Sequence, residues 1–264
     1  DYAIDETRLF RFLSATQPDE MEKLGVFKSD LKKAQFLNRL RGEIAKRGII
    51  DVLRNGIKVY PADLVMFYLT PSEKNIKAKA QNIFSVTRQL QYSKDATRLA
   101  LDLCIFINGL PVITCELKNQ LTKQNVDDAV YQYKTDRDPK ELLFQFKRCM
   151  VHFAVDDARV KFCTKLDGKA SWFLPFDKGY NDGAGNPPNP SGIMTDYLWK
   201  DILEKYMLAH IIENYAQVVE KVDQETKKKT YTQIFPRYHQ LSAVESLLSD
   251  VRHNGVGQRY LIQH

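Results

Sequence analysis

Three residues near the middle of the 264-residue chain have side chains and a spacing that suit hydrolytic chemistry. Asp102 begins the segment DLCIFINGLPVITCELK, which ends in Glu116, Leu117 and Lys118. Two carboxylates held close together in a mostly buried setting repel each other, so we expect them to share a cation. Mg2+ suits such a site because it uses few protein oxygens and keeps positions for water and phosphate oxygens. A lysine beside that ion can orient a water or help to deprotonate it, which is the chemistry of phosphodiester hydrolysis.

A hairpin of two buried strands is the element that must hold these residues. The apolar runs LCIFI and VITC, joined by NGLP, predict it, and residues two apart on a strand share a face, as Glu116 and Lys118 do. A plain two-residue turn at Asn108-Gly109 places Asp102 opposite Cys115 and sends Glu116 to the other face. A three-residue loop or a bulge places Asp102 opposite Glu116. The alternative is that Asp102 is a strand-end acid and that Glu116 and Lys118 are a solvated pair.

Hydrophobic periodicity predicts the elements around the hairpin. The segment 176–192 is dense in glycine, proline and asparagine and predicts a loop, whereas the charged segment 220–231 predicts a solvated connector. Strands, then a helix, then further strands indicate a mixed α/β core. We expect helices over 5–13, 30–53, 126–137 and 197–222, and strands over 82–93, 99–107, 112–118, 149–156 and 159–166.

Composition excludes several classes of protein. No apolar run approaches the roughly 18 residues that span a bilayer, and the N-terminal segment lacks the basic start of a signal peptide, so we expect a cytoplasmic protein without membrane contact. The net charge of +6 is compatible with a polyanionic partner. The cysteines form no CxxC or Cys/His cluster, which favours small buried side chains over disulfides or a zinc site. They are Cys104, Cys115, Cys149 and Cys163.

Asp102 followed by Glu116-Leu117-Lys118 resembles the PD-(D/E)XK nuclease motif as it occurs in the restriction subunit, the R subunit, of type I restriction-modification enzymes. The resemblance implies an α/β, restriction-endonuclease-like fold with a mixed central sheet flanked by helices. It also implies an ATP-dependent endonuclease and translocase that acts on double-stranded DNA with specificity (S) and methyltransferase (M) subunits. By this resemblance Asp102 and Glu116 are metal ligands, joined by the main-chain carbonyl of Leu117, and Lys118 is the catalytic lysine. From about residue 75 onward it covers, in order, NIFSVTRQLQY, ELKN, DDAVYQY, DRDPKELLF, VHFAVD, FLPF with GAGNP, TDYLW, FPRYHQLSAV and YLIQH.

Two positions depart from the family pattern. The related R subunits carry Gln-x-x-x-Tyr on the helix after the catalytic strand, and Gln132 occupies the position of the glutamine. Asp136 stands where the family has tyrosine, which leaves the tyrosine's role to Tyr131 or Tyr133 or leaves it unfilled. Leu101 stands in place of the motif's proline, a variable letter. Gln132 can still contact DNA or support the site.

The early helices offer further candidates. Nucleases of this superfamily often carry another acid on an early core helix, and Glu6 is preferred to Glu43 for that role, although either can be a solvated helix residue. A basic helix face could follow a DNA backbone or be solvated. This face comprises Lys32, Lys33, Arg39, Arg41, Lys46 and Arg47.

The C-terminal segment resembles the adenine-reading glutamine element of superfamily two helicase motors. An amide can both donate to and accept from an adenine edge, so Gln240 is a candidate for recognising the base of ATP, with a helix cap or a structural amide as the alternative. Segment 259–264, RYLIQH, predicts an apolar strand, and its position indicates a fragment cut before its next domain is complete. The phosphate-binding GxxxxGK[ST] loop is absent, so we expect this chain neither to hydrolyse ATP nor to translocate.

These interpretations divide the chain into three parts. Residues 1–180 form the endonuclease domain, with a core over about 55–175; residues 181–230 form a connector loop and helix; and residues 231–264 begin a RecA-like motor domain. The expected function is Mg2+-dependent cleavage of double-stranded DNA in a type I restriction complex, with ATP required by the full-length protein and the DNA sequence chosen by another subunit. A non-catalytic DNA-binding or docking module and a motor ATPase remain as alternatives.

Overall fold

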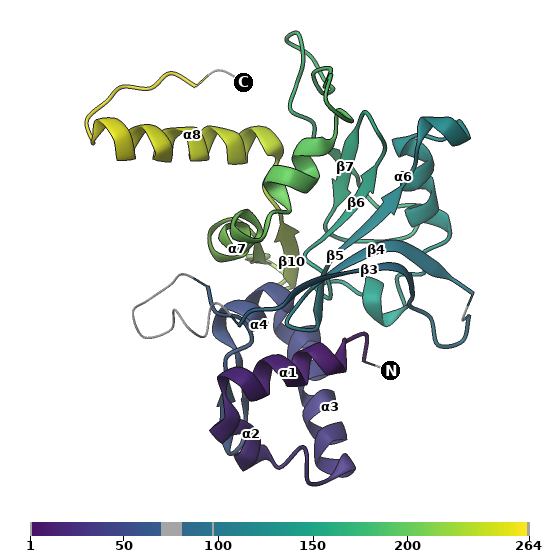
Figure 1. The fold of residues 1–264 in the computed structure, drawn as a ribbon, viewed down its shortest axis with the longest axis vertical. Coiled ribbons are helices and arrows are strands. Elements are labelled where there is room, and N and C mark those ends of the chain that lie inside the picture. The colour runs from purple at the N-terminus through teal and green to yellow at the C-terminus, as the bar shows by residue number, and fades with distance from the viewer. Residues whose placement is uncertain (1, 70–80, 97, 263–264) are drawn as a thin grey trace.

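A mixed β-sheet forms the centre of the molecule (Figure 1). The computed structural model describes residues 2–69, 81–96 and 98–262, and within these ranges the sheet has six strands in the order β3-β4-β5-β6-β7-β8. Strands β5 and β6 pair in parallel, whereas the other neighbours pair antiparallel. The predicted mixed α/β core is therefore confirmed. The strands are β3 (Phe84–Gln91), β4 (Ala100–Ile107), β5 (Leu110–Leu117), β6 (Val151–Val155), β7 (Val160–Cys163) and β8 (Leu174–Pro175).

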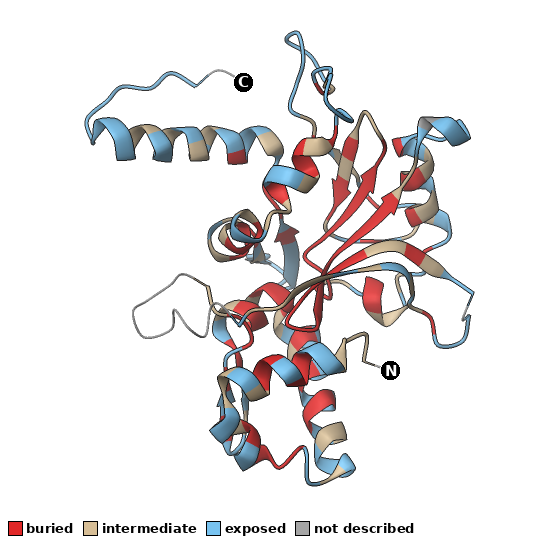
Figure 2. Ribbon diagram, in the orientation of Figure 1, coloured by how far each residue is buried: buried red, intermediate tan, exposed pale blue. Residues whose placement is uncertain are grey.

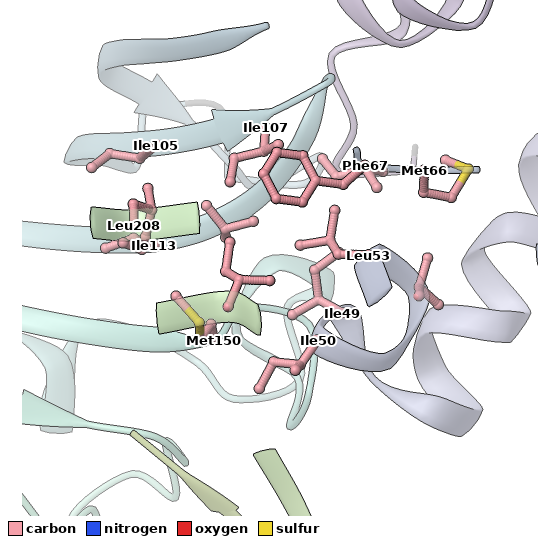
Figure 3. Close-up of a cluster of buried hydrophobic side chains, with 14 of the residues drawn as sticks. Ile49, Ile50, Leu53, Met66, Phe67, Ile105, Ile107, Ile113, Met150 and Leu208 are labelled. Atoms are coloured by element: carbon pink, nitrogen blue, oxygen red, sulfur yellow. The ribbon is translucent and has the colours of Figure 1, made fainter. Parts of the chain in front are cut away.

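One face of the sheet packs against helices from both ends of the chain. Ile105, Ile107 and Ile113 alternate along β4 and β5 and enter the larger hydrophobic cluster, where they meet Ile49 and Leu53 (Figure 3). The apolar positions of these helices recur at helical spacing, so each helix turns one side towards this cluster. The helices are α1 (Glu6–Thr16), α2 (Pro18–Leu24), α3 (Asp30–Arg47), α4 (Ile49–Asn55) and α7 (Lys205–Asn214), and a short hairpin of β1 (Ile57–Val59) and β2 (Ala62–Leu64) follows α4.

The opposite face of the sheet carries α6 (Val126–Thr135), which connects the parallel strands β5 and β6. Ala129 and Tyr133 of this helix pack in a second hydrophobic cluster with Cys104 and Ala154 of the sheet. Figure 2 shows β5, β6 and β7 as a continuous buried region, whereas the edge strand β3 is intermediate or exposed. All four cysteines are buried and free of disulfides, as the sequence predicts.

Two predicted helices are wrong in their extent. The helix expected over 30–53 is broken at Gly48, whose φ of +90° suits glycine, so α3 ends at Arg47 and α4 begins at Ile49. The helix expected over 197–222 consists of a π-helical turn, Leu198–Ile202, and α7, and its last part forms a strand. The charged segment expected as a solvated connector completes an antiparallel hairpin with that strand. The hairpin consists of β9 (Gln217–Val222) and β10 (Lys229–Ile234).

The C-terminal part ends in α8 (Tyr238–Asn254), which extends away from the sheet (Figure 1). Leu241 is the residue of α8 that is buried. The strand expected over 259–264 is not formed as far as residue 262, because no described strand lies beside it to accept its hydrogen bonds; residues 263 and 264 lie outside the described part. No helix in the described ranges is long and apolar enough to cross a bilayer.

Candidate active site

The register of the β4–β5 hairpin brings the two predicted carboxylates to one face of the sheet. A two-residue turn pairs Ile107 with Leu110, and a shift between Ile105 and Phe106 leaves Val112 as an extra residue on β5. Leu103 then pairs with Cys115, so the next opposed pair is Asp102 and Glu116. The bulge on which the predicted chemistry depends is therefore present.

The turn is anchored on both sides. Asn108 and Gly109 have φ values of +49° and +80°, as a tight two-residue hairpin turn requires, and asparagine and glycine adopt these values most readily. The Asn108 side chain is fully buried, where its Oδ1 accepts a hydrogen bond from the Ile83 N–H at 2.7 Å and its Nδ2 donates to the Met66 carbonyl at 2.9 Å. The Asp5 N–H donates to the Gly109 carbonyl at 2.8 Å. The start of α1 thus holds the end of the hairpin opposite to Glu116.

Asp102 is half-buried and uses both carboxylate oxygens. Oδ2 accepts a hydrogen bond from the Leu117 N–H at 2.8 Å, and Oδ1 accepts one from Nε2 of Gln89 at 3.0 Å. Gln89 lies on the edge strand β3 with a φ of +50°, a value that few non-glycine residues adopt. The backbone of β5 and the side chain of β3 together fix the direction of the Asp102 carboxylate.

Glu116 is fully buried and bonded through one of its two oxygens. Nε of Arg137 lies 2.6 Å from Oε1, whereas Oε2 is buried without a hydrogen-bond partner. Burial raises the pKa of Glu116 to about 7, and although Arg137 opposes this shift, the nearby Asp102 carboxylate adds to it. A buried carboxylate oxygen without a donor is costly, so Oε2 is the place where a cation would be stabilised.

Lys118 follows β5 and lies on the same face as Glu116, because side chains alternate along a strand. Its N–H donates to the Val155 carbonyl at 2.8 Å, which continues the β5–β6 pairing by one residue. Its Nζ donates to Oε1 of Gln132 at 2.6 Å, and both side chains are half-buried. The structure therefore brings Gln132 to the candidate catalytic lysine.

Helix α6 is fixed at its N-terminus. Asn125 and Asp128 form a capping box, and Oδ2 of Asp156 accepts a hydrogen bond from the Val126 N–H at 2.7 Å. This cap, together with the apolar contacts of the helix, sets the position of Gln132 over β5.

The two tyrosines of α6 point in different directions. Tyr133 is fully buried, and its hydroxyl lies 2.8 Å from Oγ1 of Thr114, which in turn lies 2.7 Å from Nδ1 of His152. Tyr131 is 67% exposed, and Asp136 caps the helix C-terminus. Tyr133 supports the sheet beneath Glu116, whereas Tyr131 is available to a partner in solution.

The other predicted site residues lie apart from the acid pair. Glu6 begins α1 beside the hairpin turn, roughly 20 Å along β5 from Glu116, and pairs with Lys33 at 2.7 Å. Gln240 accepts a hydrogen bond from the Arg237 N–H at 3.1 Å and so caps α8, which is the alternative role considered for it. The structure brings neither residue to Asp102 and Glu116.

The basic face of α3 is partly neutralised by ion pairs. Arg39 and Arg47 both bond Glu43, at 2.9 and 3.2 Å. Lys33 pairs with Glu6, as described above. DNA contact along this face stays a prediction.

Arg137, Tyr92 and Gln89 are the contacts of the site that the sequence interpretation missed. Arg137 lies in TDRDPKELLF, two residues beyond the end of α6, and a lone arginine in that place is the signal that could have indicated a partner for a buried acid. Gln89 lies opposite Asp102 on the neighbouring strand, which could have been found by aligning β3 with β4.

The residues present fit a hard divalent cation. Two opposed carboxylates, one of them with a buried oxygen that has no donor, suit Mg2+, which prefers oxygen ligands. No group of three or more His, Cys, Asp and Glu side chains gathers for a metal in the described ranges. Asp102 and Glu116 would hold such an ion, together with the main-chain carbonyl of Leu117 that the family resemblance implies.

Comparison with known proteins relates the chain to type I restriction enzymes. The family model described as type I restriction enzyme R protein N terminus matches residues 14–171, a range that includes Asp102, Glu116, Lys118 and Gln132. A protein of Methanocaldococcus jannaschii, named as a candidate type I restriction enzyme MjaVIIIP endonuclease subunit, is 24% identical over 237 residues. The match covers 85% of this chain and 20% of that protein, so the chain spans about a fifth of the relative's length.

Proposed function

Because the chain belongs to the family of type I restriction enzyme R proteins, at their N terminus, we propose that it is the Mg2+-dependent endonuclease domain of such a subunit. Its substrate would be the phosphodiester bonds of double-stranded foreign DNA. The mixed sheet flanked by helices fits a nuclease-like fold.

The observation that carries this proposal is the opposition of Asp102 and Glu116 across β4 and β5. Apolar strands hold the two acids in place, and Oε2 of Glu116 has no donor. Arg137 compensates Oε1 of Glu116 but not Oε2, so a metal ion at Oε2 would lower the free energy of the acid pair, as in the metal site of a nuclease.

The chain's own residues have distinct parts in the proposed reaction. Asp102, Oε2 of Glu116 and the Leu117 carbonyl would hold Mg2+, which when bound supplies charge stabilisation for the phosphoryl oxygens and the leaving oxygen. Lys118 orients the attacking water as an ammonium, or as the neutral amine accepts its proton, and Gln132 holds Nζ of Lys118 through the bond at 2.6 Å. Arg137 keeps Glu116 in place.

The activity of the whole protein is also a proposal. In the longer protein we infer ATP-dependent translocation by a motor domain that starts near residue 231, and assembly with S and M subunits in the cytoplasm. The family resemblance supports the requirement for ATP, and the relative's name as an endonuclease subunit also supports partner subunits.

Metal titration tests the nuclease proposal directly. The chain should bind Mn2+ or Mg2+ and lose that binding in Asp102→Asn, whereas Asp167→Asn, which removes an exposed carboxylate elsewhere, should bind as wild type does. Absence of metal binding in wild type would favour the alternative of a non-catalytic DNA-binding or docking module with a structural acid pair.

Cleavage by the full-length enzyme tests the catalytic roles. Lys118→Ala should lower the rate of DNA nicking by about 10²- to 10⁴-fold, the usual contribution of a positioned acid or base, and Glu116→Ala should abolish nicking. Both should leave the ATPase activity intact. Unchanged nicking in either variant would end the assignment.

A further inference from the structure

Arg137 is buried beside the candidate metal site and bonded on three sides. It is 4% exposed, and each of its nitrogens has its own acceptor. Nε donates to Oε1 of Glu116 at 2.6 Å, Nη2 to the Ala100 carbonyl at 3.0 Å, and Nη1 to the Tyr92 hydroxyl at 3.1 Å. The guanidinium therefore has one orientation.

The partners of Arg137 are themselves fixed. Ala100 lies on β4, two residues before Asp102, so the arginine is bonded to the same strand as the other acid. The Arg137 guanidinium carbon lies 5.4 Å from the centre of the Tyr92 ring, and that ring packs edge-on against Phe144 at 4.7 Å. The geometry at Glu116 is thus tied to the sheet and to the second hydrophobic cluster.

The two carboxylate oxygens of Glu116 have different surroundings: Oε1 is bonded to Arg137, whereas Oε2 has no hydrogen-bond partner. The terminal torsion of a glutamate is broad and roughly two-fold, so an unrestrained carboxylate would exchange its oxygens freely. Arg137 occupies Oε1 and leaves Oε2 without a donor. We propose that Arg137 is a positioning residue for the metal site, holding Glu116 by Oε1 so that Oε2 stays available, next to Asp102, for a divalent cation.

Because Arg137 is charged, a positioning role and a purely electrostatic role predict opposite effects on metal affinity. A guanidinium close to the acid pair repels a divalent cation, so electrostatics alone predicts that removing it tightens metal binding. A positioning role predicts the opposite, because Glu116 loses its fixed orientation. Partners of metal ligands typically contribute about 10- to 100-fold to metal affinity.

Titration of the chain with Mn2+, monitored through the electron paramagnetic resonance signal of free Mn2+, shows whether a substitution weakens or tightens metal binding. Arg137→Gln should weaken Mn2+ binding by about 10-fold or more. Arg137→Lys should also weaken it, because a lysine retains the charge but cannot form the planar three-sided contact. An affinity equal to or tighter than wild type in both variants would overturn the proposal.

A matched ion pair at the start of β7 serves as the control. Nε of Arg159 lies 2.6 Å from Oδ2 of Asp177, whose side chain is 4% exposed, so Arg159→Gln breaks a contact of the same kind away from the site. Its Mn2+ affinity should equal that of wild type. Tyr92→Phe keeps the ring but removes the acceptor of Nη1, and it should weaken Mn2+ binding in the same direction by a smaller factor. If the Arg137 variants fail to fold by circular dichroism, wild-type affinity in Tyr92→Phe overturns the proposal.

The proposal rests on the nuclease function proposed above, and the titration separates the two. If wild type binds no Mn2+, or Asp102→Asn binds it as wild type does, the metal site itself is wrong. If wild type binds Mn2+ and Asp102→Asn does not, but the Arg137 variants bind normally, only the positioning role fails.

Discussion

Nζ of Lys118 lies 2.6 Å from Oε1 of Gln132, so a helix residue holds the amine that follows β5. An amide oxygen accepts from an ammonium without neutralising it, so Gln132 can orient Lys118 and leave its charge available for the reaction.

Gln132→Ala should lower the single-turnover rate of DNA cleavage by the full-length enzyme by about 10- to 100-fold, because the lysine loses its orientation. Mn2+ affinity should not change, since Lys118 is no ligand. Gln35→Ala, at an exposed glutamine of α3, is the control and should cleave as wild type does. A normal rate in Gln132→Ala would mean that the bond has no catalytic role.

The charge at position 89 should tune the metal site. Gln89 is exposed and donates to Oδ1 of Asp102, so Gln89→Glu adds a third carboxylate and should tighten Mn2+ binding by about 10-fold, whereas Gln89→Lys should weaken it by about as much. The same changes at the exposed Gln91, two residues along β3, should have smaller effects. Equal effects at the two positions would show that only the general charge of the surface matters.

Gly109→Ala should destabilise the fold. An added Cβ would lie 2.3 Å from the Asp5 carbonyl oxygen and 2.6 Å from the Leu9 nitrogen, at a φ of +80°, and we expect a loss of about 3 kcal/mol in the free energy of unfolding by urea. Gly168→Ala has a φ of +53° and its nearest atom at 3.9 Å, so it should cost only about 1 kcal/mol. Similar losses in both variants would indicate that the α1 contact adds nothing.

His152 should make the fold sensitive to acid. Burial lowers the pKa of His152 from 6.5 to about 3, so between these values the unfolded chain takes up a proton that the folded chain does not. The contribution of His152 to the free energy of unfolding is complete above pH 6.5. It falls by on the order of 4 kcal/mol as the pH drops towards 3. His152→Gln should lose this part of the pH dependence in urea unfolding from pH 7 to pH 3, whereas His253→Gln, at an exposed position, should retain it. Parallel pH profiles for wild type and His152→Gln would contradict the assignment.

Much of the site could be predicted because it depends on local patterns. The apolar runs around Asn108-Gly109 specify the hairpin, and the requirement that Asp102 oppose Glu116 specified a bulge that the structure places at Val112. Periodicity also gave the helix that carries Gln132.

The errors arose where tertiary contacts decide. The segment 217–222 is compatible with a helix or a strand, and pairing with Lys229–Ile234 selects the strand despite the charge of both segments. The helical pattern of the sequence continues through Gly48, and only the positive φ of this residue shows that α3 ends before it. Arg137 reaches Glu116 across 21 positions of sequence through the path of α6, which no local pattern encodes.

The bulge at Val112 has a consequence for how this hairpin can vary among relatives. The 13 residues between Asp102 and Glu116 consist of two turn residues, the bulged Val112 and five opposed pairs on the two strands. A single insertion or deletion that leaves turn and bulge unchanged would reverse the alternation of one strand and move Glu116 into the cluster that contains Ile113. A relative that lacks the bulge but keeps the 13-residue spacing must lengthen its turn by one residue instead. Across relatives that keep both acids, the turn and the bulge, the spacing between the acids should therefore change only in steps of two residues.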